Sequence, residues 1–281
     1  MYQAKANGKN TLRFFDQTIQ TTLEARVTLE AELRQALPLG QLTLYYQPQF
    51  DGARNIIGAE ALIRWQHPER GLVLPGDFIT LAEETGIIIP IGQWVLVTAC
   101  ALLRNWQSRS EYSELTLSVN VSARQFLHPD FVEMVKQVLE ETGAAPDKLK
   151  LELTESMMLD DVAATIDKMR ALRALGVGIS MDDFGTGYSS LSYLKQLPLS
   201  ELKIDKSFVR DIVEESNGAV IVRTIITMAR SFGLNVVAEG VETVTQFAIL
   251  KQYRCRGFQG YFLARPITLT EFEEMVRATC A

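Results

Sequence analysis

The sequence predicts an α/β fold, a TIM-like (β/α)8 barrel with one antiparallel strand at its start. Eight short apolar stretches have the length and composition of strands, and helical stretches separate most of them. The first two predicted strands are joined by "DGARN", a connection typical of an antiparallel hairpin. The strand–helix–strand units that follow favour a parallel barrel, with a doubly wound open sheet as the alternative architecture.

The elements are expected in the following order. Residues 1–16 indicate the end of a helix, a glycine turn and a short edge strand, and residues 17–37 indicate a connecting helix. Further helices are expected over 131–143, 162–176 and 219–233, the last two ending at glycine as helices often do. The predicted strands are 42–50, 56–65, 115–122, 149–155, 177–184, 201–205, 234–239 and 256–262.

Composition excludes several classes of protein. The 281 residues carry a net charge of -6, which argues against long nucleic acid as a partner, because such a partner needs a basic face. No apolar run has the length of a membrane span and the first residues lack a signal-peptide pattern, so we expect a cytoplasmic domain without membrane contact from this segment.

The three cysteines suit reduced thiols, and His67 and His128, each before a proline, suit packing or surface roles. Hydrolytic chemistry would therefore use carboxylates, lysine and a hard metal that prefers oxygen ligands.

Polar residues recur near the C-terminal ends of the predicted strands, all in one phase of the strand alternation. The other phase is apolar and suits contact with outer helices. In a barrel the polar phase points inward, and the C-terminal strand ends surround the site of chemistry. A single acid in such a place more often caps a helix or faces water. The inference that these residues form a site therefore rests on the number of strands that carry a polar residue on the same side. The residues expected to converge are Glu60, Asn120, Glu152, Asp182, Asp183, Lys203, Glu239 and Gln259.

The charges of these residues predict a bound cation. Five carboxylates face one lysine, and two divalent cations would balance the excess negative charge. Two hard cations bridged by a carboxylate are a recurrent arrangement for hydrolysing phosphodiesters. Asp182, beside Asp183, is the expected bridging ligand, and the glycines of "GTGYSS" would let the following loop pack close to the metals.

The motifs along the chain carry a resemblance to a known family. They include "YYQPQ", "GAEALIRWQHPERG", "SVNVSARQF", "LELTES", "DDFGTGYSSLSYL", "LKIDKSFV", "VVAEGVET" and "GFQGYFLARP". In combination they resemble the EAL domain of cyclic-di-GMP phosphodiesterases over residues 24–281. The opening "MYQAKANGKNTLRFFD" resembles the tail of a GGDEF domain. Residues 1–23 are therefore expected to be that tail and the start of a linker helix, within a longer protein that carries an upstream GGDEF or sensor domain.

The resemblance implies two metal ions, Mg²⁺ or Mn²⁺, and a set of catalytic residues. Lys203 is expected to orient the hydrolytic water and help to deprotonate it, although Glu239 matches a residue assigned as base in the family, and the sequence leaves both open. Glu155 resembles the residue that steadies the "DFGTGYSS" loop. Glu60 and Asp183 complete the catalytic set. The expected ligands of the first metal are Glu60, Asn120, Glu152 and Asp182, and those of the second are Asp182 and Asp183, with Glu239 nearby.

The resemblance also implies a set of residues that hold the dinucleotide. Arg64 suits a phosphate and Asp77 suits the N–H edge of guanine. Alternatives remain open for several positions: Asp77 would equally suit a cap for the helix "FITLAEETG", and Gln47 would suit pairing with backbone. Four aromatics near the strand ends (Tyr45, Tyr46, Phe258 and Tyr261) suit core or rim positions better than base stacking. The matching substrate positions are Gln47, Leu62, Arg64, Asp77, Glu242 and Gln259.

The function expected from these observations is metal-dependent hydrolysis of cyclic-di-GMP to linear pGpG. No motif position carries a substitution that would mark a degenerate copy. The first alternative is a catalytically silent cyclic-di-GMP receptor of the same fold that signals to a protein partner. The second alternative is an unrelated barrel enzyme, such as a Mg²⁺-dependent lyase. Family resemblance also makes a homodimer plausible, paired through the region after "DDFGTG".

Overall fold

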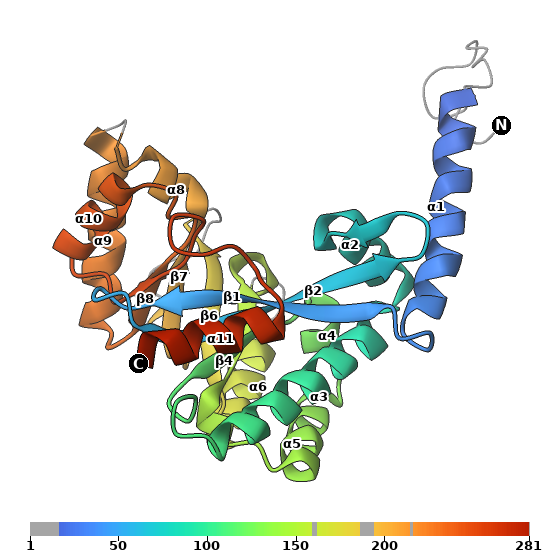
Figure 1. The fold of residues 1–281 in the computed structure, drawn as a ribbon, viewed down its shortest axis with the longest axis horizontal. Helices are drawn as coiled ribbons and strands as arrows, with labels where there is room; N and C mark the ends of the chain where they lie inside the picture. Colours follow the sequence, from blue (N-terminus) through green and yellow to red (C-terminus); the bar gives the residue numbers. More distant parts are fainter. Residues whose placement is uncertain (1–16, 159–161, 186–193, 214–215, 281) are drawn as a thin grey trace.

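The computed structural model describes residues 17–158, 162–185, 194–213 and 216–280. In this part of the chain eight strands close into a barrel, as predicted, and Figure 1 shows helices packed around it. Around the ring the strands follow the order β1, β9, β8, β7, β6, β5, β4, β2, and β2 pairs with β1 to close it. The strands are β1 (Leu42–Phe50), β2 (Ile56–His67), β4 (Thr116–Asn120), β5 (Leu149–Thr154), β6 (Gly178–Phe184), β7 (Glu201–Ile204), β8 (Asn235–Ala238) and β9 (Gly257–Phe258).

The first strand, β1, is antiparallel to both of its neighbours, β2 and β9, whereas the other strands of the ring are parallel. The β1–β2 turn forms as the "DGARN" sequence predicts. The Asp51 Oδ1 accepts hydrogen bonds from the backbone N–H groups of Ala53 and Asn55, both at 2.8 Å. Such a local side-chain bond closes the turn and fixes the strand register, which places Gln47 opposite Glu60.

One strand was not predicted and the last predicted strand is much shorter than expected, while the bounds of the other strands agree with the prediction to within two residues. A short strand, β3 (Gly71–Val73), pairs with the end of β2, and three residues are too few to give an alternation in the sequence. The final strand was expected to reach residue 262 but ends at Phe258. At Gly260, where φ is 156°, a Cβ would lie 2.2 Å from the backbone N of Val241. The chain turns at this glycine because its neighbours pair with Val241, whose N–H donates to the Gln259 carbonyl at 3.0 Å and whose carbonyl accepts from the Phe262 N–H at 3.0 Å.

Local signals in the sequence begin and end many of the helices. α2 begins at Pro75, a residue suited to the first helical turn, and is followed by Gly86 in the left-handed conformation with φ of 80°. The predicted helices 131–143, 162–176 and 219–233 correspond to α5, α6 and α9. The helices are α1 (Gln17–Ala36), α2 (Pro75–Thr85), α3 (Ile88–Gln107), α4 (Ala123–Leu127), α5 (Phe131–Thr142), α6 (Val162–Ala174), α8 (Lys206–Asp211), α9 (Ser216–Ser231), α10 (Val244–Gln252) and α11 (Leu269–Cys280), with 3₁₀ turns η1 (Pro146–Lys148) and η2 (Glu155–Met158).

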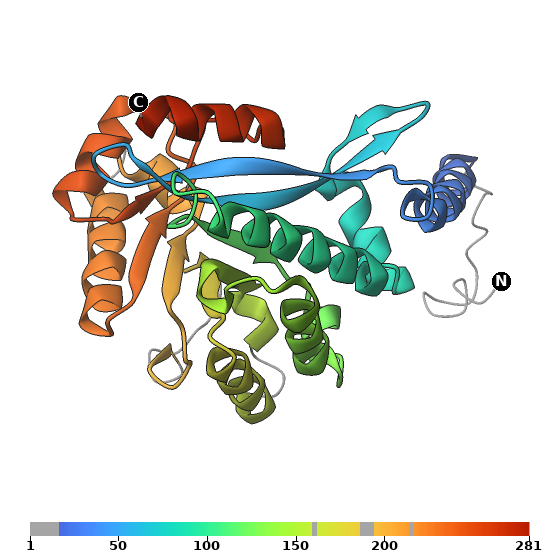
Figure 2. The ribbon, with the colours of Figure 1, turned by 60° about the horizontal axis from the view of Figure 1, so that its bottom comes forward.

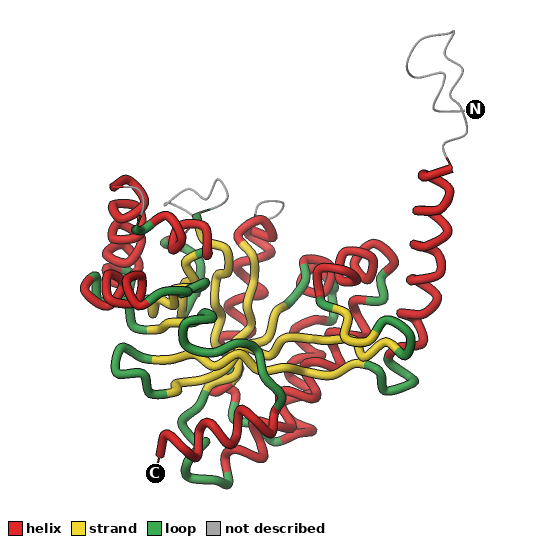
Figure 3. The backbone as a smooth tube through the Cα atoms, turned by 45° about the horizontal axis from the view of Figure 1, so that its top comes forward, coloured by secondary structure: helices red, strands yellow, loops and turns green. Residues whose placement is uncertain are grey.

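Helix α1 stands away from the barrel, as Figure 1 and Figure 3 show, and contacts it through its C-terminal part. Leu33 and Ala36 are fully buried, while Val27 is 67% exposed. Glu32 ties the helix to the end of β2, because its carboxylate lies 3.2 Å from the Nε2 of His67 and 3.1 Å from Arg70. His67, the last residue of β2, is therefore a packing residue, as expected.

The outer layer of the barrel is apolar, as the strand alternation predicts. Figure 2 shows α3, α5 and α6 arranged along one side of the strands. Leu151, Ile179 and Leu202 face this layer and are fully buried. Of the described helices, α3 is the one long and apolar enough to cross a membrane. Half of its most apolar stretch is buried inside this protein. Because the apolar phase points outward, the polar phase of each strand is directed into the barrel.

Candidate active site

Four strands of the barrel bring four predicted carboxylates around one lysine. The Lys203 Nζ lies 2.6 Å from Glu152, 2.5 Å from Glu239, 3.4 Å from Glu60 and 3.5 Å from Asp182. Lys203 and Glu152 are almost completely buried. Burial alone would lower the pKa of Lys203, but the surrounding carboxylates raise it well above its usual value. Lys203 is therefore an ammonium that neutralises part of the charge of this cluster.

Two amides fix the carboxylate of Glu60. The Asn120 Nδ2 donates to Glu60 Oε1 at 2.6 Å, and the Gln259 Nε2 donates to Glu60 Oε2 at 2.5 Å. Gln259 also donates to Gln47 at 3.1 Å, so residues from β1, β2, β4 and the end of β9 meet here. Burial opposes ionisation of Glu60, yet Lys203 and the hydrogen bonds from Gln259 and Asn120 lower its pKa. Glu60 is thus held ionised and in one orientation.

The cluster nevertheless carries more acid groups than Lys203 can neutralise. Burial, and then the charge of Glu60, raise the pKa of Glu152 well above its usual value. Burial raises the pKa of Glu239 to about 8, with Lys203 opposing the shift and Asp182 and Glu60 adding to it. Protons therefore occupy acids that a cation would otherwise neutralise. The arrangement favours binding of positive charge in the mouth of the barrel.

Asp182 and Asp183 lie at the end of β6, and each can direct a carboxylate oxygen toward Glu239. One oxygen from each of these three residues lies within 4.8 Å of the other two. Asp183 has a left-handed backbone with φ of 53°, and its N–H donates to Asp182 Oδ1 at 3.0 Å. Asp is one of the few residues that tolerate this conformation, which turns the chain out of the strand.

Sequence reasoning missed Asp205 as a neighbour of this site. Burial, together with the charges of Asp182 and Asp205, raises the pKa of Asp183 to about 6. Asp205 hydrogen-bonds to Asp183 through its side chain and also caps α8, where it accepts from the N–H of Ser207 at 2.9 Å. Asp205 follows Lys203 by two residues, so the alternation places both side chains in the same phase. That parity was the signal that could have identified it.

The donor set fits an oxygen-preferring divalent cation. The Glu152 Oε1 is buried and has no hydrogen-bond partner among the described residues. An unpartnered carboxylate oxygen in this environment is costly, and a cation bound beside it would remove that cost. Carboxylate and amide oxygens are the ligands preferred by Mg²⁺ and related hard cations. Two groups of side chains are therefore suited to hold metal. One consists of Glu152 with the Glu60–Asn120 pair, and the other consists of Asp182, Asp183 and Glu239.

Glu155 contacts the start of the loop that follows β6. Its Oε2 accepts a hydrogen bond from the Gly185 N–H at 2.9 Å. Gly185 has φ of 99°, and a Cβ there would lie 2.7 Å from the Phe208 ring, so glycine is required. Residues 186–193, which include Gly187 and most of "GTGYSS", lie outside the described residues. The expected loop packing near the metals therefore stays a prediction beyond Gly185.

The predicted substrate residues fall into different places. Gln47 and Gln259 join the acidic cluster, and Arg64 lies on the same strand as Glu60, with its guanidinium 5.5 Å from the centre of the Tyr45 ring. Glu242 is exposed beyond the end of β8.

Asp77 is exposed and lines a hollow of about 280 Å³ that α2 shares with Arg26 and Leu29 of α1. The alternative that Asp77 caps α2 is wrong, because Leu74 is the N-cap residue and no side chain caps it.

The aromatic residues near the mouth occupy the positions expected from the sequence. Tyr46 is 3% exposed and Phe258 is fully buried, so both belong to the core. Tyr261 is 54% exposed and lies at the rim, where the Arg265 guanidinium stacks 4.3 Å from its ring centre. Tyr46, Phe258 and Tyr261 thus occupy core or rim positions, as predicted.

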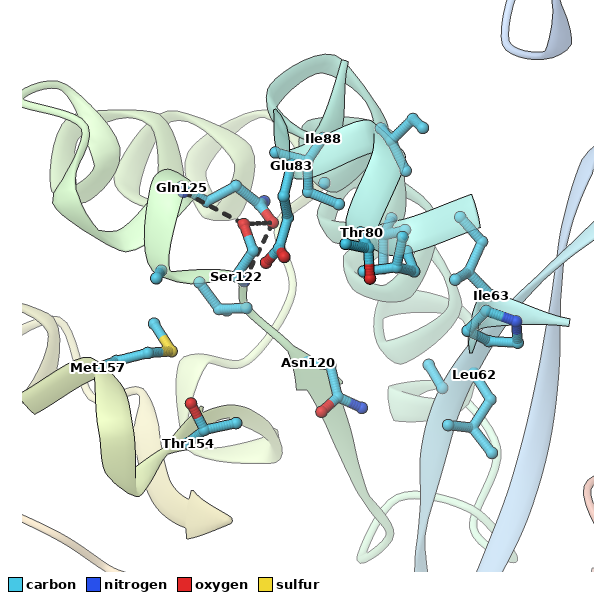
Figure 4. A pocket seen from close by; sticks show the side chains of 18 of the residues that line it. Leu62, Ile63, Thr80, Glu83, Ile88, Asn120, Ser122, Gln125, Thr154 and Met157 are labelled. Carbon is cyan, nitrogen blue, oxygen red and sulfur yellow. Dashed lines mark hydrogen bonds between the residues drawn. The ribbon is translucent and has the colours of Figure 1, made fainter. Parts of the chain in front are cut away.

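A cavity of about 660 Å³ adjoins the cluster between β2, α2, α3 and the segment after β4. Figure 4 shows Asn120 at its floor, Leu62 and Ile63 on one side and Met157 on the other. Most of the lining is apolar, and the Glu83 carboxylate is directed into the space. Volumes of this size are typical of small-molecule sites. Because Asn120 belongs both to this cavity and to the carboxylate cluster, a ligand bound at the cluster has space to extend into it.

Fold and site together define a (β/α)8 barrel whose acidic mouth is suited to divalent cations. The family model for the EAL domain matches residues 30–266, and the chain belongs to this family. The chain is 44% identical over 268 residues to the bifunctional diguanylate cyclase/cyclic di-GMP phosphodiesterase MucR of Pseudomonas aeruginosa, covering 95% of this chain and 39% of the relative. It is 42% identical over 281 residues to the cyclic di-GMP phosphodiesterase NbdA of the same organism, covering 99% of this chain and 36% of the relative. The chain therefore spans about two fifths of the length of these curated relatives.

Solved structures resemble the barrel closely. The Pseudomonas aeruginosa MucR phosphodiesterase in complex with c-di-GMP has a TM-score of 0.84 at 45% identity, covering 87% of this chain and 99% of that chain. The EAL enzyme Bd1971 in its cAMP and cyclic-di-GMP bound form has a TM-score of 0.86 at 36% identity, covering 91% of this chain and 70% of that chain. The predicted barrel and the predicted family are thus confirmed.

Proposed function

We propose that this chain is a cyclic-di-GMP-specific phosphodiesterase that opens the cyclic dinucleotide to linear pGpG. The observation that carries the proposal is the convergence of Lys203 with four carboxylates, each carried by a different strand or the residue directly after it, in the mouth of an EAL barrel. Relatives named as phosphodiesterases of this nucleotide support the choice of substrate. The site therefore suits a dinucleotide whose phosphate lies over the cluster.

The proposed cofactor is a pair of Mg²⁺ or Mn²⁺ ions. When bound, such ions would polarise the phosphate and make water a better nucleophile. Asp182 is proposed to contribute to both sites. The proposed ligands of the first ion are Glu60, Asn120, Glu152 and Asp182, and those of the second are Asp182, Asp183 and Glu239.

Lys203 and Glu239, whose Nζ and carboxyl oxygen lie 2.5 Å apart, are the groups proposed to orient the attacking water and take its proton. Because the surrounding carboxylates hold Lys203 as an ammonium, it could accept a proton only after bound cations had replaced its charge in the cluster. The two roles can be separated by the pH dependence of kcat. A Glu239→Gln variant whose remaining activity keeps the wild-type pH profile would assign the proton acceptor to Lys203. Glu155 is proposed to act indirectly, by holding the chain at Gly185 where the loop after β6 begins.

Binding of the dinucleotide is proposed to involve both sides of the cluster. Arg64 would pair with a phosphate, and Gln47 and Gln259 would extend the hydrogen-bond network that already contacts Glu60. The proposed substrate set is Gln47, Leu62, Arg64, Asp77, Glu242 and Gln259. We further propose a cytoplasmic location, a homodimer and, on the resemblance of residues 1–16 to a GGDEF tail, an upstream GGDEF or sensor domain.

The test is incubation with cyclic-di-GMP, with and without Mg²⁺ or Mn²⁺, followed by chromatographic identification of the product. We expect pGpG in the presence of either metal and none after treatment with EDTA. Binding of cyclic-di-GMP without any turnover in either metal would contradict the proposal and favour a silent receptor. Absence of binding would contradict the proposed substrate.

A further inference from the structure

Gln49 is a buried glutamine one layer beneath the acidic cluster. It lies on β1 in the same phase as Gln47, so both side chains belong to the inner face of the barrel. Because β1 runs antiparallel to β2, Gln47 is paired with Glu60, while Gln49 is paired with Gly58, farther from the mouth. Gln49 is 1% exposed. Burying an amide costs free energy unless its polar atoms are hydrogen-bonded, so the contacts of Gln49 indicate its role.

The side chain of Gln49 is connected to the cluster through one other glutamine. The Gln49 Nε2 donates to the Gln259 Oε1 at 3.0 Å. The Gln259 Nε2 in turn donates to the Glu60 Oε2 at 2.5 Å and to the Gln47 Oε1 at 3.1 Å. The Gln49 Oε1 is buried and has no hydrogen-bond partner among the described residues. Within this part of the chain, the bond to Gln259 is therefore the contact that fixes the Gln49 amide.

The direction of each bond in this series is set by groups that can only accept. The Glu60 carboxylate accepts from Gln259, which must therefore present its Nε2 to Glu60. At the other end, the Gln47 Nε2 donates to the Ala264 carbonyl at 3.3 Å, which leaves the Gln47 Oε1 to accept from Gln259. Gln259 then has its Oε1 left to face Gln49, and Gln49 must donate. Reversing the Gln259 amide would place its oxygen against the Glu60 carboxylate.

We propose that Gln49 is a positioning residue, which holds the Gln259 amide with its N–H groups toward Glu60 and Gln47. Gln259 in turn fixes Glu60, a proposed ligand of the first metal ion. Residues that orient a metal ligand in this way typically contribute about 10–100-fold to metal affinity or rate. This inference rests on the proposed function and adds a residue that acts on the cluster through Gln259.

The alternative is that Gln49 only fills space inside the barrel. Gln49→Met separates the two roles, because Met keeps the length of the side chain and removes the N–H that holds Gln259. The matched control is Gln41→Met. The Gln41 Oε1, just before β1, accepts from the Trp65 Nε1 at 3.0 Å, and Trp65 lies in the outward phase of β2. This control removes an amide hydrogen bond of the same length outside the barrel interior.

The experiment measures Mn²⁺ affinity by calorimetry, melting temperature in EDTA and kcat/KM for cyclic-di-GMP. For Gln49→Met we expect Mn²⁺ affinity and kcat/KM to fall about three- to ten-fold, the range that one net hydrogen bond gives. For Gln259→Met we expect a decrease of about 10–100-fold. In the Gln259→Met background, Gln49→Met should add less than about two-fold, because the donor then has no amide to hold. For Gln41→Met we expect both quantities within about two-fold of the wild type.

Wild-type Mn²⁺ affinity and kcat/KM in Gln49→Met would overturn the inference, and an early melting temperature in that variant would then make Gln49 structural. Full additivity of the Gln49→Met and Gln259→Met effects would also overturn it, because a residue that acts through Gln259 has no separate effect once Gln259 is replaced. A wild type that binds Mn²⁺ but does not cleave cyclic-di-GMP would overturn the proposed function. The coupling of the two substitutions in Mn²⁺ affinity would still decide the role of Gln49.

Discussion

Replacing Lys203 by Met would leave the carboxylates of the barrel mouth without their buried ammonium. Lys203 is fully buried and lies within 3.5 Å of Glu60, Glu152, Asp182 and Glu239. Removing one partner of a buried, hydrogen-bonded ion pair typically costs about 3–5 kcal/mol, because the remaining charge is left uncompensated. Met fills similar space, so the loss reports mainly on charge. We expect the metal-free Lys203→Met variant to be destabilised by about that amount.

Protons can replace part of the missing charge, and this makes the loss depend on pH. Burial raises the pKa of Glu152 well above its usual value and that of Glu239 to about 8. An acid whose pKa is raised by folding stabilises the protein below its unfolded pKa and loses that contribution as the pH rises through the folded pKa. The melting temperature of the variant in EDTA should therefore fall further below that of the wild type near pH 8.5 than near pH 6. For a domain of this size, about 3–5 kcal/mol corresponds to a decrease on the order of 10 °C.

The assay is thermal unfolding in EDTA and in saturating Mn²⁺, together with turnover of cyclic-di-GMP. Mn²⁺ should recover much of the lost stability, because bound cations replace the ammonium, but should not restore turnover. Lys150→Met is the matched control. The Lys150 Nζ pairs with the buried Glu201 at 2.7 Å near the opposite ends of the strands, so this variant should be destabilised without recovery by Mn²⁺. Equal recovery of both variants, or a Lys203→Met variant as stable as wild type in EDTA, would refute the reasoning.

Four further outcomes are expected. Glu60→Ala should abolish turnover and weaken Mn²⁺ binding measured by calorimetry, since it removes the carboxylate that Asn120 and Gln259 hold in place. Asp183→Asn should lower kcat by roughly a thousand-fold, because the change weakens binding of the second metal. The melting temperature in EDTA should be equal or slightly higher, because the change relieves repulsion with Asp182 and Asn suits the left-handed backbone. Ca²⁺ should support binding of cyclic-di-GMP but not its hydrolysis, because it prefers longer, less regular coordination and acidifies water less than Mg²⁺ does. Mn²⁺ affinity should rise between about pH 6 and pH 8.5, because binding must displace the proton of Glu239, whose pKa is about 8, and Glu239→Gln should flatten this dependence.

Each of these outcomes has a contrary result that would remove its basis. Wild-type turnover by Glu60→Ala in saturating Mg²⁺ would contradict its assignment as a ligand. An Asp183→Asn protein that melts early yet cleaves normally would make Asp183 a structural residue and would require the two-metal proposal to be withdrawn. Formation of pGpG in Ca²⁺ after removal of residual Mg²⁺, or Mn²⁺ affinity that does not vary with pH, would count against the corresponding coordination chemistry.

The polar residues that face into the barrel were predictable because the alternation of side chains along a strand is a local property. Glu60, Glu152 and Lys203 each follow apolar residues by one position, and a barrel directs that phase toward its mouth. The antiparallel β1 was predictable from its short connection to β2, and its bounds, Leu42–Phe50, match the expectation. These features depend on neighbours in sequence, so no knowledge of distant contacts was needed.

Other features depend on contacts between distant segments and left no local signal. The end of β9 is set by the close approach of Gly260 to Val241, which belongs to the segment after β8. The directions of Asp77 and Glu83 depend on how α2 packs between α1 and the barrel, since both acids fit the same helical pattern. Helical spacing gives relative directions around one axis, but it does not say which direction faces the site.

The separation of apolar and polar phases also explains why site variants should affect metal binding and rate more than folding. Residues such as Leu151 and Leu202 bury the outer faces of the same strands that carry Glu152 and Lys203. The core therefore depends on the outward-facing apolar residues, while the charge of the mouth depends on the inward-facing polar residues. Without cations, the excess acid is neutralised by Lys203 and by protons on acids such as Glu239. Metal binding replaces those protons, so metal affinity and stability should both depend on pH. Substitution of an apolar residue on the outer face of a strand should instead alter stability equally at every pH and metal concentration.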